Sequence, residues 1–327
     1  MCLDADQPQF DAARCERGNG VYILNANSRQ KVAEFPTKAP VVADVSVLDI
    51  DNDGFLDFAY VADAAGNLYR LNFTSLAGLR DASASPMTPS EWSLTHIAAS
   101  SLPNIRFLNK PVIGAIQNRV FVTIGSGDRE RPLKQNYPFT ETVGNRFYAL
   151  VDEPYDQAAG VINLDRESTA TERSMLNAAD GLPAGQSLIE LHRGWFVDLP
   201  DQGEQVVNPS AIGGGYVFFN SYQPEGGTGG LCRDLGKSKA YQIPLFSPRK
   251  PQGKTFGQGI PIPPVIATVR LNTGGAACSG FYCGEGEAPN EIVTVCIGCE
   301  GFNPVEIAPD VSDAVREAYQ AEDIDRL

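Results

Sequence analysis

A short strand pattern with a tyrosine near its start recurs along this chain and does most to limit its possible folds. Each copy reads apolar–Tyr–x–apolar: VYILN (21–25), LYRLN (68–72), FYALVD (147–152) and AYQIPL (240–245). The tyrosines are Tyr22, Tyr69, Tyr148 and Tyr241. Alternating apolar and polar positions over five or six residues are typical of a half-buried β-strand. The pattern therefore predicts four short strands, widely spaced along the sequence.

A second pattern precedes three of these strands. A proline with an apolar or small neighbour leads into another apolar run that ends in a Gly- or Asp-rich turn, and proline suits the first residue of a strand. The copies are Pro40-Val41 before DFAYVADAAG, Pro111-Val112 before RVFVTIGSGD, and Pro209-Ser210 before GYVFFNSYQPEGG. A fourth copy starts at Pro264-Val265 and runs to EIVTVCIG, with no tyrosine strand after it. Repeated groups of strands joined by polar turns indicate β-propeller blades.

We therefore expect an all-β fold, an incomplete set of about four propeller blades with long insertions at 74–105, 154–190 and 223–238. The 32 glycines and 23 prolines agree with many turns and short strands. The first repeat has only its late strands and the last only its early ones. Either residues 21–35 complete the blade begun at Pro264, which closes a four-bladed ring, or the ring is incomplete. A β-sandwich with coincidental tyrosines is the alternative.

Three segments follow from this pattern. Residues 1–20 are expected to form a disulfide-type loop, residues 21–305 the blades, and residues 306–327 a tail with a short helix. In that tail, one helical face carries Val311, Val315, Ala318 and Tyr319.

The stretch DIDNDGFLD at 49–57 places four aspartates around one glycine. In D-x-D-x-D-G loops, alternate carboxylates converge on a cation, the glycine permits a sharp turn, and the next carbonyl faces inward. Oxygen donors without His or Cys favour calcium over zinc or copper. Position 12 is Tyr60 rather than glutamate, and both flanks look like strands, so the loop is not an EF-hand. A solvated acidic turn is the alternative. The predicted Ca²⁺ ligands are Asp49, Asp51, Asp53, the main-chain oxygen of Phe55, and Asp57.

Charge and hydropathy exclude two kinds of partner. The net charge of −14 is the wrong sign for binding phosphates, so we expect no nucleic acid. No apolar stretch approaches the roughly 20 residues of a membrane helix, so we expect no membrane insertion. The start MCLDADQPQF lacks the basic and apolar regions of a signal peptide. Because its loop cysteines favour an oxidising compartment, we expect the chain to be part of a longer secreted precursor.

Two interpretations of the cysteines stay open. The spacing Cys278-x4-Cys283-x12-Cys296-x2-Cys299 is similar to a zinc ribbon, but two small disulfide loops, Cys278–Cys283 and Cys296–Cys299, or crossed pairs, also fit. Cys2 and Cys15 are expected to pair across a polar loop, and Cys232 is left over.

Catalysis has little support in the sequence. Its two histidines, His96 and His192, have no nucleophile motif beside them, so we assign both a structural or surface role. We therefore expect no enzyme. A secreted quinoprotein-like enzyme and a calcium-dependent carbohydrate-binding module are the alternatives.

The stretch LDIDNDGFLDFAYVADAAGNLYRLNF resembles the calcium-binding blade in the C-terminal domain of PilY/PilC-type proteins, which are type IV pilus biogenesis factors and tip-associated adhesins. The resemblance covers residues 19–245 and includes NKPVIGAIQNRVFVTIGSGD, VGNRFYALVDEP, GWFVDLPDQGEQVVNPSAIGGGYVFFNSYQP and GLCRDLGKSKAYQIPL. Within GWFVDLP we expect Trp195 to be buried between strands and Asp198 to turn the chain.

The resemblance implies a modified β-propeller of the quinoprotein type, with calcium at the five ligands named above. It further implies that calcium occupancy regulates pilus extension, retraction, twitching motility and surface adhesion. The implied partners are major or minor pilins and a host or surface receptor. The implied location is extracellular, on the bacterial cell surface, at the pilus tip or outer membrane. Family members also carry a signal peptide, a large N-terminal region and further blades, so this chain resembles a fragment.

Overall fold

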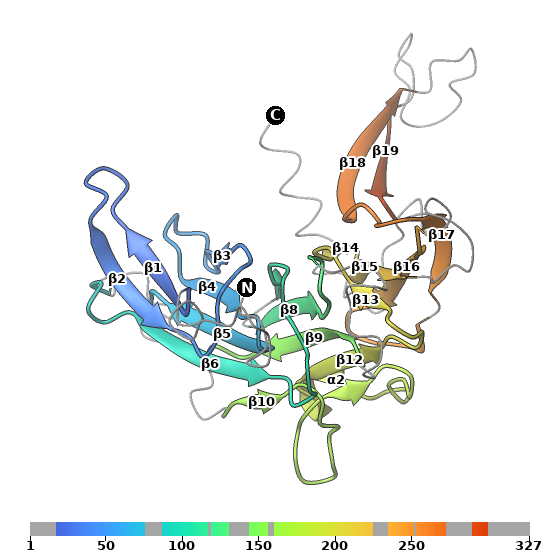
Figure 1. Cartoon of the computed structure of the whole chain (residues 1–327), viewed down its shortest axis with the longest axis horizontal. Coiled ribbons are helices and arrows are strands. Elements are labelled where there is room, and N and C mark those ends of the chain that lie inside the picture. Colours follow the sequence, from blue (N-terminus) through green and yellow to red (C-terminus); the bar gives the residue numbers. More distant parts are fainter. Residues whose placement is uncertain are drawn as a thin grey trace, which may run out of the picture.

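Strands make up almost all of the regular structure in the computed structural model of the chain (Figure 1). It describes residues 18–75, 87–116, 119–130, 144–155, 160–224, 235–251, 253–272 and 290–299. Within these ranges the single helix is α2 (Leu188–Leu191), which makes one turn. The predicted all-β class is confirmed.

Three stretches of the chain form antiparallel meanders, and each contains the strands that the two sequence patterns predict. The first contains β3 (Ser46–Leu48), β4 (Phe58–Ala62) and β5 (Asn67–Asn72). The second contains β7 (Val112–Ile116), β8 (Arg119–Gly125) and β9 (Arg146–Asp152). The third contains β14 (Ala211–Gly213), β15 (Tyr216–Gln223) and β16 (Lys237–Pro244). The tyrosine strand is the last of the three in every meander.

Each meander is widened by strands that neither pattern predicts. An antiparallel strand joins each tyrosine strand: β6 (Ser93–Ala99), β12 (Gly194–Asp198) and β17 (Lys254–Gln258). Three two-residue strands join next: β10 (Ile162–Asn163), β11 (Leu176–Asn177) and β13 (Gln205–Val206). β10 lies parallel to β6, β11 lies parallel to β12, and β13 lies antiparallel to β15. The insertion expected at 74–105 thus supplies β6, which lies inside the first sheet, and the insertion at 154–190 supplies the edge strands β10 and β11.

Two hydrophobic clusters hold the three sheets together. The first cluster joins side chains of β4 and β5 to side chains of β8 and β9. The second joins the other face of β8 and β9 to β15 and β16, and in it the ring of Phe219 stacks between Phe147 and Tyr241, with centroid separations of 3.9 and 4.6 Å. The middle sheet is therefore apolar on both faces, which explains the almost continuous apolar runs of β8 and β9.

Three of the four pattern tyrosines are buried and donate their hydroxyls to carboxylates. Tyr69 donates to Asp63 at 2.8 Å. Tyr148 donates to Asp165 at 2.7 Å, and Tyr241 donates to Glu204 at 2.6 Å. Burial, and then the charge of the nearby carboxylate, raise the pKa of the Tyr148 and Tyr241 hydroxyls, which therefore remain donors at neutral pH. Tyr22 is the exception, because its side chain is 53% exposed.

A buried ion pair links the first and second sheets. Nη1 of Arg70, on β5, lies 2.8 and 2.6 Å from the two carboxylate oxygens of Asp152, on β9. Tyr60, on β4, donates its hydroxyl to the same carboxylate at 2.8 Å. The side chains of Arg70 and Asp152 are only 10% and 6% exposed. Removal of one charge would leave the other unpaired away from water.

Two hairpins lie outside the three sheets. The first consists of β1 (Gly20–Leu24) and β2 (Lys31–Pro36), and it packs against the first sheet through Val21, Ile23 and Phe35. The second consists of β18 (Val265–Asn272) and β19 (Asn290–Ile297), the fourth copy of the second pattern. The two hairpins form separate sheets on opposite sides of the view in Figure 1. Among the described strands, residues 21–35 do not complete the blade begun at Pro264, and no closed ring is shown.

Several predictions on the chain ends fall outside the described residues. These are the disulfide-type loop over most of 1–20, the tail at 306–327, and the pairing of Cys2, Cys15, Cys232, Cys278 and Cys283. Cys296, near the end of β19, and Cys299, just after that strand, are bonded to each other, as one of the two disulfide loops requires. Two of the four cysteines of the zinc-ribbon alternative are therefore not free thiolates.

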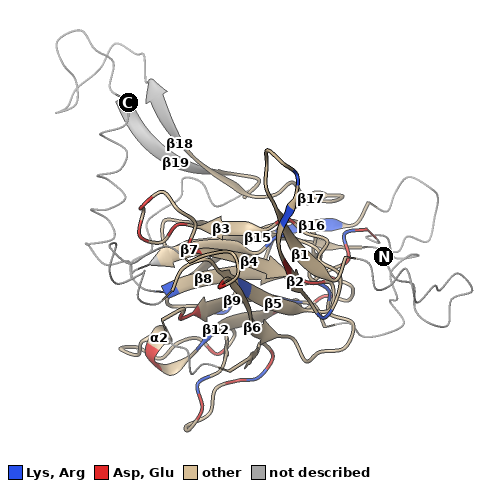
Figure 2. Cartoon of the chain, turned by 90° about the vertical axis from the view of Figure 1, so that its left-hand side faces the viewer, with Lys and Arg blue, Asp and Glu red and all other residues tan. Residues whose placement is uncertain are grey.

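Acidic and basic residues are interspersed over the described strands and loops (Figure 2). No helix in the described part of the chain has the length and apolar character needed to cross a bilayer.

Candidate metal centre

The acidic loop at 49–57 connects β3 and β4, two strands of the first sheet. The amide of Asp57 donates to the carbonyl of Leu48 at 2.9 Å, which closes the loop at its base. Within it, Asn52 has φ 58° and Gly54 has φ 92°. A β-carbon built on Gly54 would meet no atom within 4 Å, so this position requires glycine for backbone conformation and not for space. The flanking strands agree with the prediction that the loop is not an EF-hand.

Carboxylates inside the loop fold its backbone around them. Asp49 accepts hydrogen bonds from the amides of Asp53 at 3.2 Å and Gly54 at 2.9 Å. Asp51 also accepts from the Asp53 amide, at 3.2 Å. Asp53 in turn accepts from the amide of Phe55 at 2.8 Å. These local bonds are typical of Asp in tight turns, and they turn the tip of the loop back toward the sheet.

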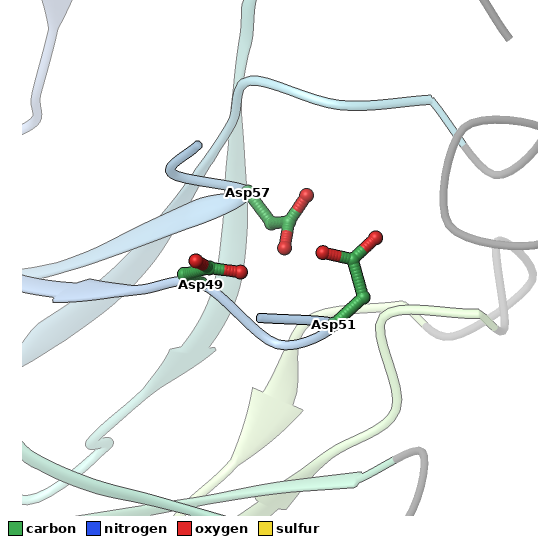
Figure 3. Close-up of side chains that lie close together, drawn as sticks. All are labelled: Asp49, Asp51 and Asp57. Carbon is green, nitrogen blue, oxygen red and sulfur yellow. The ribbon is translucent and has the colours of Figure 1, made fainter. Parts of the chain in front are cut away.

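Three of the predicted ligand side chains converge (Figure 3). Asp49, Asp51 and Asp57 each offer an oxygen, and these oxygens all lie within 4.8 Å of one another. Asp57 is buried at the end of the sheet, Asp49 is half-buried, and Asp51 is exposed. Carboxylate oxygens at these separations can be bridged by one cation whose bonds to oxygen are about 2.3–2.6 Å long.

Asp57 anchors the loop to the rest of the sheet. Its carboxylate accepts from the amide of Ile50 at 2.8 Å, and its carbonyl accepts from the amide of Phe73, just after β5, at 2.8 Å. The sequence did not indicate these two partners, because backbone amides carry no residue-specific signal. A ligand bound by Asp57 would therefore be coupled to three strands of the sheet.

Without a bound cation, the carboxylates of this cluster repel one another. Burial, and then the charges of Asp51, Asp49 and Asp53, raise the pKa of the Asp57 carboxyl, although the Ile50 amide partly opposes this shift. A divalent cation would offset the repulsion among the carboxylates. The donor set consists of hard oxygens only, which suits calcium or magnesium rather than zinc or copper. The residues present thus fit the calcium ion that the sequence motif predicts.

The remaining predicted ligands lie outside this cluster of three. Oδ1 of Asp53 accepts from the amide of Phe55, and this carboxylate is not one of the three that converge. Phe55 itself has a side chain that is 73% exposed, and only its main-chain oxygen was predicted to bind. Asp53 and the Phe55 carbonyl therefore stay predictions. Tyr60, at the position where an EF-hand has glutamate, is fully buried and bonded to Asp152.

The other residues that the sequence singled out have structural surroundings. His96 packs on the ring of Tyr69, with centroids 5.0 Å apart. Nδ1 of His192 lies 2.8 Å from the hydroxyl of Ser168. Burial lowers the pKa of both imidazoles. The prediction that Trp195 is buried is confirmed, since it is fully enclosed and donates from Nε1 to the carbonyl of Leu245 at 3.0 Å.

The fold and the loop define an all-β protein of meander sheets with an acidic loop of the D-x-D-x-D-G kind at one sheet end. No family model matches the chain. The Type IV pilus biogenesis factor PilY1 homolog of Xylella fastidiosa is 24% identical to it over 281 residues, which cover 78% of this chain and 17% of that protein. This relative confirms the resemblance to PilY-type proteins that the sequence motifs indicated.

A solved structure is also similar. The Pseudomonas aeruginosa PilY1 C-terminal domain aligns with a TM-score of 0.49 and 14% identity, over 70% of this chain and 53% of that chain. The chain thus spans about one sixth of its curated relative and about half of this solved domain.

Proposed function

We propose that this chain is a calcium-binding segment of a type IV pilus biogenesis factor, and that calcium at loop 49–57 regulates how the protein contacts its partners. The observation that carries the proposal is the convergence of the Asp49, Asp51 and Asp57 oxygens at the end of the first sheet. The PilY1 homolog of Xylella fastidiosa supports the link to pilus biogenesis. The meander sheets support a modified β-propeller of the quinoprotein type as the finer description of the fold.

Bound calcium supplies positive charge and fixed coordination geometry. The chain contributes the rest: the carboxylates hold the ion, and the Asp57 main chain transmits the position of the loop to Leu48 and Phe73. Next to the cluster, Phe55 and Leu56 are 73% and 49% exposed, so their placement depends on how the loop is folded. Calcium binding would therefore present these apolar side chains in one arrangement, and its release would let that arrangement relax.

The proposal includes the partners and the location. Major or minor pilins, and a host or surface receptor, would contact the chain on the outside of the bacterium, at the pilus tip or outer membrane. Calcium occupancy would shift pilus extension against retraction and thereby affect twitching motility and adhesion. The proposal assigns the chain no catalytic role.

Isothermal titration with CaCl₂ tests the binding step. We expect one calcium ion per chain, with affinity reduced at least about tenfold in Asp51→Asn, which removes one carboxylate from the cluster. Asp44→Asn is the matched control, because it removes an exposed carboxylate just before the loop. An absence of calcium binding by the folded chain, or an equal loss in the control, would refute the site.

A second experiment tests the regulation. Immobilised pilins of the same bacterium would be probed with the chain in CaCl₂ and in EDTA by biolayer interferometry. We expect tighter binding in CaCl₂ for the wild type and no calcium effect for Asp51→Asn. Binding that is equal in both buffers would leave the calcium site intact but reject its regulatory role.

A further inference from the structure

A cleft of about 330 Å³ lies where the second sheet meets the third, away from the acidic loop. Its lining comes from β11, the end of β12, β16 and the segment after β16. Ligand pockets in proteins begin at about this size, so the cleft has room for a small ligand. No sequence motif marks it, because its residues come from four separate stretches of the chain.

One wall of the cleft requires a glycine, Gly253, because its backbone lies against the ring of Tyr241. A β-carbon at Gly253 would lie 2.6 Å from the Tyr241 ring, which is held in a stack with Phe219 and cannot move away cheaply. Glycine thus lets the backbone at position 253 pass directly over Tyr241. Pro200 and Pro251 supply apolar surface to the same cleft.

The floor is a fixed polar network. Lys239 is 12% exposed and pairs with the carboxylates of Asp201 and Glu204. Glu204 is fully buried and also accepts from the hydroxyls of Tyr241 at 2.6 Å and Ser221 at 2.5 Å. The ammonium group of Lys239 therefore cannot swing away, and the floor keeps its charges in place.

Both signs of charge are available at the rim. The carboxylate of Asp198 is 53% exposed and accepts from Nε of Arg146 at 2.5 Å, which leaves acceptor capacity toward the cleft. Lys250 is exposed and lines the cleft, and no carboxylate of the described residues pairs with it. An anionic ligand would be repelled by Asp198, and a cationic ligand would be repelled by Lys250. A neutral ligand whose groups both donate and accept hydrogen bonds meets neither penalty.

We propose that this cleft binds a neutral sugar. Ring hydroxyls would donate to Asp198 and accept from Lys250, while the C–H face of the ring would lie on Pro200 and Pro251. The site is separate from the calcium loop, so it gives the chain a second means of surface attachment that does not depend on the metal.

Saturation-transfer difference NMR with glucose, galactose, mannose and N-acetylglucosamine tests this assignment, with acetate as the anionic probe. We expect transfer to at least one sugar, none to acetate, and the same result in CaCl₂ and in EDTA. Lys250→Ala and Asp198→Asn should each weaken binding about tenfold, because each removes a charge-assisted hydrogen bond. Arg249→Ala is the matched control, since it removes a neighbouring exposed charge that does not line the cleft.

Four results would overturn the proposal. These are the absence of transfer to any of the four sugars, transfer to acetate alone, an equal loss in Arg249→Ala, and sugar binding that disappears in EDTA. The last result would place the sugar at the calcium loop.

Discussion

Replacement of Asp57 by asparagine should change stability in opposite directions with and without calcium. Asparagine keeps the shape of the side chain and an oxygen that can accept from the Ile50 amide, but it removes one negative charge from the cluster. In EDTA the variant should be more stable than the wild type, because it lacks the repulsion. In CaCl₂ it should be less stable, because it has lost a ligand.

The magnitude of the first effect follows from the geometry. Two charges 4.8 Å apart repel by about 0.9 kcal/mol in a water-like dielectric. Because Asp57 faces two such carboxylates, Asp49 and Asp51, its neutralisation should stabilise the metal-free chain by about 1–2 kcal/mol.

The second effect is larger and has the opposite sign. Calcium at about 1,000 times its Kd stabilises the wild type by about 4 kcal/mol, and a variant that binds a hundredfold more weakly gains only about 1.4 kcal/mol. The difference of roughly 2.7 kcal/mol exceeds the relief of repulsion, so the order of stabilities should reverse.

Urea denaturation of both proteins in EDTA and in CaCl₂ measures the two effects directly. Asp44→Asn again serves as the control, and it should behave like the wild type in both buffers. If the variant and the wild type keep the same order of stability in both buffers, the three carboxylates do not act as one cation site.

Three further predictions concern the frame around the sites. Asp152→Ala should lower the free energy of unfolding by about 3–5 kcal/mol in urea, because it strands the buried guanidinium of Arg70, and a loss below about 1 kcal/mol would contradict that burial. Trp195→Phe leaves the carbonyl of Leu245 without its donor and should cost about 1–3 kcal/mol, measured by thermal unfolding; an unchanged melting temperature would argue against this hydrogen bond. Burial raises the pKa of Asp165, but hydrogen bonds and a nearby arginine outweigh burial and lower the pKa overall, so the ionised carboxylate stabilises the fold at neutral pH and this stabilisation is lost as the pH falls through the lowered pKa. Asp165→Asn should therefore flatten the fall in stability at acid pH, and an unchanged slope would reject this reasoning.

The strands that carry one of the two patterns could be predicted from the sequence, whereas β6, which is seven residues long, carries neither pattern and was not found. β5, β9 and β16 were located by their tyrosines alone. The two-residue strands β10 and β11 could not be found, because two residues show no periodicity and their partners are distant. Asn163, for example, pairs with Ala99.

The two candidate sites differ in the same way. The acidic loop lies within nine consecutive residues, 49–57, so its motif was visible in the sequence, and three of its carboxylates lie close together in the structure. The cleft is formed by residues as far apart as Asn177 and Gly253, and Lys239 and Lys250 look like ordinary surface lysines in the sequence. Only the packing of the second sheet against the third brings them together.

The hydrogen bonds from the hydroxyls of Tyr148 and Tyr241 to carboxylates affect how much the loops between strands can vary in length. Asp165, the partner of Tyr148, follows β10, and Glu204, the partner of Tyr241, precedes β13. Each bond fixes the far end of a connection to a strand that is already in the core. Since each doubling of a flexible connection adds only about 0.6 kcal/mol of closure entropy, residues could be inserted between β9 and β10 at little cost in stability. That tolerance accounts for tyrosine strands that recur at such unequal intervals while the sheets they build remain alike.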